Sequence, residues 1–265
     1  MKILLPLLMS VLALAGCAST SPVGGSAPGA ATNIPGSDNM RARVHTELAA
    51  GYYSRAQYGV ALDELKKALE AESGYAPAHN ILALVRAELR EDALAEEAFR
   101  RAISLMPQYS EAHNNYGLFL CQRGRAEEAM ARFEMALGNP LYATPEKALA
   151  NAGACSLARN DLAKAEMFYT RAVRHAPGFE LAVLGMAEVD YRQGRLLAAR
   201  AKLQHLGERQ ELNAQGLWLG ARVEHAMGDR AAMASYGAQL RRRFPEAMQT
   251  QWLILGQYDQ NGGLL

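Results

Sequence analysis

The chain has 265 residues, half of them hydrophobic, and its formal net charge at pH 7 is +1. A charge this close to zero argues against nucleic acid as a partner, because binding to phosphates needs a basic surface. Alanine is abundant and β-branched residues are few, which favours helices over strands. Roughly 225 residues follow the low-complexity start, enough to bury a sizeable core.

Residues 1–16 have the layout of a secretory signal peptide. Lys2 is the only charge in this leader, and its apolar stretch is too short to span a bilayer. Residues 14–17 (LAGC) resemble a bacterial lipobox, in which the peptidase cuts before a cysteine that carries the lipid. We therefore expect Cys17 to be the lipidated first residue of the mature chain. The alternative is an ordinary signal peptide followed by an incidental cysteine.

Residues 17–39 predict a flexible, lipidated tether. They are rich in Ser, Gly, Pro and Ala, and a coil of about 20 such residues spans on the order of 25 Å. Ala18 stands where lipoproteins of the inner membrane usually carry Asp, which favours anchoring in the outer membrane, on its periplasmic face. No later stretch is apolar enough to predict a membrane span.

From about residue 40 the sequence repeats with a period of about 34 residues. Each unit carries a small residue, a large apolar or aromatic residue four positions later and, in most units, a further Ala or Leu. The successive marks are Ala61-Leu65-Ala68, Ala95-Phe99-Ala102, Ala129-Phe133-Ala136, Ala165-Tyr169-Ala172, Ala199-Leu203-Leu206 and Ala232-Tyr236. This pattern resembles the tetratricopeptide repeat (TPR), a helix–turn–helix unit.

We therefore expect an all-α protein, a right-handed α-solenoid of six TPR units over residues 40–245. Gly124, Gly194 and Gly228 fall in the turns within units, where a left-handed residue is favoured. Small residues should let the two helices of a unit approach closely. Residues 246–265 should supply a C-terminal capping helix, over residues 246–258, and a frayed tail.

No set of residues predicts catalysis, and we expect neither enzymatic activity, nor a cofactor, nor a small-molecule substrate. The chain lacks a Walker loop, an HExxH motif and a nucleophile elbow. His45, His79 and His113 recur at the repeat period, which favours a shared packing position over a metal site. Acidic pairs at residues 96–97 and 127–128 open second helices, where their charge suits the helix dipole better than acid–base chemistry.

The basic run at residues 241–243 ends the last repeat. The simpler interpretation is a solvated helix end, stabilised by the dipole. The alternative is contact with anionic lipid headgroups or an acidic partner.

Cys121 and Cys155 lie on the first helices of units three and four, which should pack side by side. Because the periplasm is oxidising, we predict a disulfide between them. A closed loop of about 35 residues would stabilise the fold by about 4 kcal/mol in the chain-entropy estimate. The alternative is two small buried thiols.

The first helices of a TPR solenoid line a groove that binds extended peptides or partner helices. Projection of the repeat positions predicts that eight residues of the first three units line it. These are Thr46, Tyr53, Asn80, Leu84, Glu88, Asn114, Leu118 and Gln122. Asn114 and Asn115 could equally be helix-surface or capping residues. Thr46 and Ala50 stand where a carboxylate clamp would need Lys and Asn, which argues against that ligand.

Six short runs go beyond a generic repeat. They are residues 113–121 (HNNYGLFLC), 139–142 (NPLY), 151–153 (NAG), 219–222 (LGAR), 234–237 (ASYG) and 240–245 (LRRRFP). With the lipobox and six repeats, they resemble the type IV pilus biogenesis/stability lipoproteins, the PilF/PilW-like pilotins. The resemblance covers residues 40–252.

The resemblance implies a role in assembling the outer-membrane secretin through which the pilus passes. It implies that the lipid on Cys17 carries the protein to the outer membrane while the groove holds a secretin segment. One rival hypothesis is a lipid-anchored TPR scaffold for outer-membrane protein assembly or peptidoglycan synthesis. Another is an enzyme regulator or hydrolase with a helical accessory domain.

Overall fold

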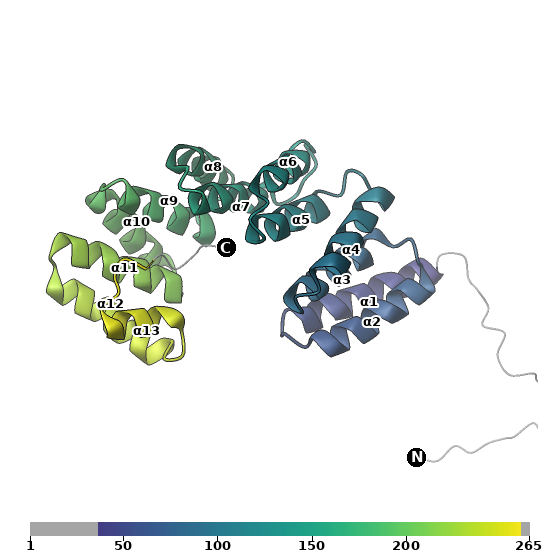
Figure 1. Cartoon of the computed structure of the whole chain (residues 1–265), viewed down its shortest axis with the longest axis horizontal. Coiled ribbons are helices and arrows are strands. Elements are labelled where there is room, and N and C mark those ends of the chain that lie inside the picture. Colours follow the sequence, from purple (N-terminus) through teal and green to yellow (C-terminus); the bar gives the residue numbers. More distant parts are fainter. Residues whose placement is uncertain (1–36, 261–265) are drawn as a thin grey trace, which may run out of the picture. The chain divides into compact units, whose positions relative to one another are not determined.

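The computed structural model describes residues 37–260. Within that range the protein has 13 α-helices and no strand (Figure 1). The predicted signal peptide, Cys17, all but the end of the predicted tether and residues 261–265 lie outside the described residues. Among residues 37–260, no helix has the length and apolar character needed to cross a membrane.

The first twelve helices form six consecutive pairs. The first helices of the pairs are α1 (Ser37–Tyr53), α3 (Ala76–Glu88), α5 (Ser110–Gln122), α7 (Pro145–Ala158), α9 (Glu180–Arg192) and α11 (Ala214–Met227). The second helices are α2 (Tyr58–Ala71), α4 (Asp92–Leu105), α6 (Ala126–Leu137), α8 (Leu162–His175), α10 (Leu196–Arg209) and α12 (Arg230–Arg243). Each first helix packs on its own second helix and on the first helix of the next pair. The all-α TPR solenoid is confirmed.

Glycines on the first helices make room for aromatic rings from the second helices. A Cβ on Gly117 would lie 2.7 Å from Cε1 of Phe133, and one on Gly153 would lie 2.8 Å from Cε1 of Tyr169. Contacts this short leave no space for a side chain. The small residues of the repeat therefore set the distance between the two helices of a pair, as the sequence predicted.

The turns within pairs all use one left-handed residue. Gly124, Gly194 and Gly228 have φ of +77°, +74° and +78°, as predicted. The other three turns place Ala56, Arg90 and Asn160 at φ of 56°, 63° and 59°. A left-handed conformation costs a non-glycine residue about 1 kcal/mol, which the packing of the adjoining helices must offset.

Both ends of the solenoid differ slightly from expectation. The first helix begins at Ser37, three residues inside the predicted tether, with the acidic Asp38 in its first turn. The capping helix, α13 (Met248–Leu255), packs on α11 and α12 and is shorter than predicted. It ends because Gly256 adopts a left-handed conformation, with φ of +67°.

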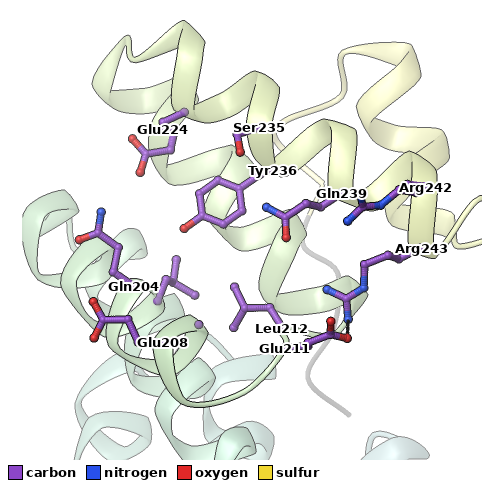
Figure 2. Close-up of a pocket in the computed structure, with 13 residues that line it drawn as sticks. Gln204, Glu208, Glu211, Leu212, Glu224, Ser235, Tyr236, Gln239, Arg242 and Arg243 are labelled. Carbon is purple, nitrogen blue, oxygen red and sulfur yellow. Dashed lines mark ion pairs between the residues drawn. The ribbon is translucent and has the colours of Figure 1, made fainter.

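A cavity of about 670 Å³ opens between α10 and α12. Figure 2 shows Tyr236 projecting from α12, with Gln204 and Glu208 of α10 facing it. At one edge, Arg243 pairs with Glu211 at 3.0 Å. Its lining combines Leu203, Leu212 and Tyr236, which belong to or pack against the apolar core, with polar side chains of α10 and α12.

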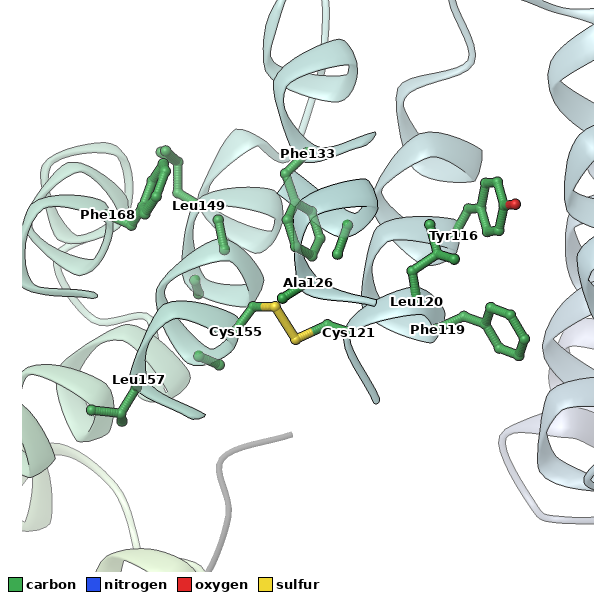
Figure 3. Packing of buried hydrophobic residues seen from close by; sticks show 14 of the residues in the cluster. Tyr116, Phe119, Leu120, Cys121, Ala126, Phe133, Leu149, Cys155, Leu157 and Phe168 are labelled. Carbon is green, nitrogen blue, oxygen red and sulfur yellow. A yellow bond between two sulfur atoms is a disulfide. The ribbon is translucent and has the colours of Figure 1, made fainter. Parts of the chain in front are cut away.

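The structure joins Cys121 on α5 to Cys155 on α7 by a disulfide, with the two Cα atoms 5.9 Å apart. Both cysteines are buried in the largest apolar cluster, near Leu120, Ala126 and Phe133 (Figure 3). The bond therefore links the first helices of the third and fourth pairs inside the core.

Candidate binding surface on the first helices

The predicted groove residues fall into two groups. Thr46, Asn80 and Asn114 are buried, with exposed fractions of 6%, 2% and 6%. Tyr53, Leu84 and Leu118 are half-buried, and Glu88 and Gln122 are exposed. All eight lie on α1, α3 and α5. A ligand on this surface would contact the side chains of the second group. Those of the first group are covered by neighbouring residues.

Thr46 serves its own helix. Its hydroxyl donates to the carbonyl of Ala42, one turn earlier on α1, at 2.7 Å. This bond satisfies a buried polar group. Thr46 is thus a structural residue in this geometry, and its presence in the predicted groove rested on spacing alone.

Tyr53 and Glu88 meet across the first two pairs. The Tyr53 hydroxyl lies 3.5 Å from Oε1 of Glu88 and donates to it. Burial, and then the nearby Glu88 carboxylate, raise the pKa of Tyr53 to about 12. Tyr53 therefore remains a neutral hydrogen-bond donor at every physiological pH.

Four asparagines form a row of hydrogen bonds across α3, α5 and α7, which we call the amide ladder. Asn115 Nδ2 donates to Asn80 Oδ1 at 3.2 Å, and Asn114 Nδ2 donates to Asn115 Oδ1 at 3.3 Å. Asn151 Nδ2 donates to Asn114 Oδ1 at 2.9 Å. Each buried amide thus has a partner, as buried polar groups require.

The ladder retains capacity for a ligand at its half-buried members. A side-chain amide offers two N–H donors and a carbonyl acceptor. Among residues 37–260, the Asn151 amide bonds only to Asn114, so its carbonyl and second N–H are free. Amides that lie in a row between helices can bond to the alternating N–H and C=O groups of an extended peptide.

Two members of the ladder, Asn115 and Asn151, were absent from the predicted groove. A signal for them existed, because Asn80, Asn115 and Asn151 recur at roughly the repeat spacing on successive first helices. That spacing does not give the register between neighbouring helices. The register determines which asparagine side chains hydrogen-bond to each other.

Acidic residues at the start of α4 pair with the next repeat, which the helix-dipole interpretation of residues 96–97 did not include. Glu96 lies 2.8 Å from Nη1 of Arg125, and Asp92 lies 2.7 Å from Nη2 of Arg123. The hydrogen bond from Arg125 is the main cause that lowers the pKa of Glu96 to about 2. These pairs link the second and third repeats on the side of the turns.

Two of the three periodic histidines hydrogen-bond to the loop between two repeats. His113 Nε2 donates to the carbonyl of Pro107 at 2.9 Å, and His79 Nε2 donates to that of Ser73 at 3.0 Å. Each bond ties a first helix to the loop that precedes it. His45 differs, because its Nδ1 lies 2.6 Å from Oε2 of Glu64 on α2. No group of three potential metal-binding side chains occurs within residues 37–260.

Sequence reasoning missed a cluster of buried charges in the fifth and sixth pairs. Arg222 on α11 contacts Glu188 on α9 at 2.8 Å, and both side chains are almost fully buried. Asp190, also buried, pairs with Arg195 at 2.6 Å. The available signal was a charge at positions that carry apolar residues in other repeats, such as Glu188 directly after Ala187.

The basic run at the end of α12 is divided between two environments. Arg243 pairs with Glu211 at the edge of the cavity, while Arg241 and Arg242 are exposed. All three lie in the last turn of α12, where positive charge suits the helix dipole.

Comparison with known proteins relates the chain to a protein of the type IV pilus. The chain is 32% identical to the type IV pilus assembly protein PilF of Pseudomonas aeruginosa over 208 residues. This match covers 78% of this chain and 82% of PilF. The chain belongs to this family of type IV pilus biogenesis TPR proteins. No family model matches the sequence.

Solved structures support the assignment to this family. A crystal structure of PilW, described as a widely conserved type IV pilus biogenesis factor, superposes with a TM-score of 0.71 at 32% identity, covering 80% of this chain and 98% of PilW. The structure of Pseudomonas aeruginosa PilF gives a TM-score of 0.70 at 30% identity, covering 83% and 99%. A TPR protein from Parabacteroides merdae, 16% identical with a TM-score of 0.66 over 86% of this chain and 87% of that protein, shares the fold.

Proposed function

We propose that this protein is a lipid-anchored pilotin. It binds secretin subunits of the type IV pilus and promotes their localisation and multimerisation in the outer membrane. The observation that carries the proposal is the 32% identity to PilF over 82% of that protein's length. The predicted lipidation of Cys17 and the amide ladder support the anchoring and the binding, respectively.

The first step is anchoring. A diacylated or triacylated Cys17 would hold the chain at the membrane stably, because two acyl chains suffice where one gives only reversible binding. The Ser-, Gly- and Pro-rich residues that follow would let the TPR domain sample the space near the membrane surface.

The second step is capture of an extended secretin segment on the first helices. The amide ladder would hold its backbone, and the half-buried Leu84 and Leu118 would receive apolar side chains. A subunit held in this way stays near the membrane with its neighbours. Its effective concentration rises, and multimerisation is favoured without any further contact.

The test is the heat-resistant secretin multimer in membranes of cells with and without the gene. We expect deletion to abolish the multimer at the outer membrane and the unchanged gene to restore it. Cys17→Ala should fail to restore it there, because the anchor is lost. A multimer that is unchanged by deletion would contradict the proposal.

A matched pair of variants tests the binding surface. Leu118→Asp places a charge one turn from the ladder on α5, whereas Leu197→Asp makes the same change at a 72% exposed position on α10. We expect only Leu118→Asp to lose the secretin in co-purification, with helix content and melting temperature retained. Equal binding by both variants would exclude this surface.

A further inference from the structure

The chain after the capping helix turns back onto the last repeat. Gly256 takes the left-handed conformation, and the N–H of Gln257 donates to the carbonyl of Trp252 at 2.9 Å. The following residues lie against α11, where they contact Trp218, Arg222 and His225. These three side chains are four and three residues apart, so they share one face of the helix.

Tyr258 is the anchor of this segment. Its ring stacks on His225, with centroids 4.0 Å apart and planes 11° apart, and on Trp218, at 5.6 Å and 14°. Tyr258 is half-buried, whereas Gln257, Asp259 and Gln260 are exposed. One aromatic side chain therefore makes the main apolar contact of residues 257–260.

The backbone of the segment is held by two side-chain donors on α11. Arg222 Nε donates to the carbonyl of Tyr258 at 3.2 Å, and Trp218 Nε1 donates to the carbonyl of Gln260 at 3.2 Å. The two accepting carbonyls are two residues apart. The Arg222 guanidinium is itself oriented by Glu188 and by the Tyr191 ring, 4.4 Å from its centroid.

This arrangement has the contacts of a bound peptide, and its aromatic side chain packs against the apolar cluster that contains Trp218. Side-chain donors on a rigid helix hold two carbonyls, and an aromatic ring fills an aromatic site between them. A short segment with one anchor and exposed neighbours belongs to the least stable part of a fold.

We propose that residues 256–260 occupy a peptide-binding surface on α11 as a built-in ligand, and that a partner segment carrying an aromatic side chain displaces them. The aromatic ring of the partner takes the place of Tyr258, and its backbone carbonyls accept from Arg222 and Trp218. This inference is independent of the proposed secretin binding, because it concerns α11 rather than the amide ladder on α3, α5 and α7.

The two tryptophans provide the readout. The indole N–H signals of Trp218 and Trp252 are followed by nitrogen-15 NMR and assigned with Trp252→Phe. We expect Tyr258→Ala to shift the Trp218 signal, because the stacked ring and the bonded carbonyl are lost. Asp259→Ala, an exposed neighbour, should leave the signal in place.

The capped peptide Gly-Gln-Tyr-Asp-Gln, the sequence of residues 256–260, is then added in trans. In the Tyr258→Ala variant, this peptide should move the Trp218 signal back towards its position in the intact chain. The same peptide with Ala in place of Tyr should leave the signal unchanged. The intact chain should need at least several-fold more peptide for any change. A chain ending at Gly256 should behave as Tyr258→Ala does, and circular dichroism checks that both forms fold.

Two results would overturn the proposal. One is a Trp218 signal that does not respond to the peptide at millimolar concentrations in either folded variant. The other is an equal response in the intact chain, which would mean that residues 256–260 do not cover the site.

Discussion

The ring of Tyr169 on α8 lies so close to Gly185 on α9 that a Cβ on the glycine would come within 2.1 Å of Cζ of the ring. The same ring contacts Gly153 on α7, the first helix of its own pair. Tyr169 is fully buried. One side chain thus sets the spacing both within the fourth pair and between the fourth and fifth pairs.

Gly185→Ala should therefore be destabilising. The added methyl group must displace a fully buried ring, and overpacking of this kind costs about 1–3 kcal/mol. Urea unfolding followed by circular dichroism measures the change in the free energy of unfolding. Gly59→Ala is the matched control, because a Cβ there meets nothing within 4 Å. Equal effects at both positions would refute the spacing role.

Loss of the disulfide should destabilise the protein by up to about 4 kcal/mol, the chain-entropy value for a loop of this length. The cysteines are 34 residues apart in sequence. Two forms lack the disulfide: the double variant Cys121→Ala/Cys155→Ala and the reduced unchanged chain. Both should unfold at a lower urea concentration than the oxidised chain. An oxidised chain that is no more stable than its reduced form would contradict this prediction.

The Glu96–Arg125 pair predicts a dependence of stability on pH. The pKa of Glu96 is lowered from 4.5 to about 2 by the Arg125 hydrogen bond, so the folded state favours the carboxylate. Its contribution is complete above pH 4.5 and is lost as the pH falls towards 2. Glu96→Gln should cost about 1 kcal/mol at pH 7 and almost nothing near pH 2.

The control for this pair is Glu97→Gln, which removes the same charge from an exposed neighbour. Thermal unfolding between pH 2 and pH 7 compares the two variants. A Glu96→Gln effect that stays constant over this range would show that the pair does not titrate as described.

The buried Glu188–Arg222 pair should show strong coupling. Arg222→Met removes one of two arginines that pair with Glu188, in a contact whose side chains are 3% and 2% exposed. The cost should stay below the roughly 3–5 kcal/mol of an unpaired buried charge, because Arg192 still lies 2.8 Å from the carboxylate. The double change with Glu188→Leu should cost less, because no buried carboxylate remains. A double-mutant cycle in urea measures the coupling, and additive effects would contradict it.

The repeat architecture could be predicted because each of its signals is local. The interval from Ala129 to Phe133 places both residues on one face of a helix, and Gly124 marks the turn before it. These features follow from helix geometry and turn conformation, which neighbouring residues determine. The place of the candidate binding surface was predicted from the same periodicity.

The details of the surface could not be predicted. Spacing alone placed Thr46 in the groove, whereas its hydroxyl bonds to its own helix. The amide ladder joins Asn80 to Asn115 and Asn114 to Asn151, 35 and 37 residues apart. Such pairings depend on the register between packed helices, which a repeat pattern leaves open.

The sequence by itself determined the helix pairs, their turns and the expectation of a lipid anchor, because each depends on a short run of residues. Tertiary structure alone decided that Glu188 meets Arg222 and that Tyr258 stacks on Trp218 and His225. The partners in these contacts are 33 to 40 residues apart along the chain. They meet only because the stacked helices bring them together, and that arrangement results from the packing of the whole solenoid.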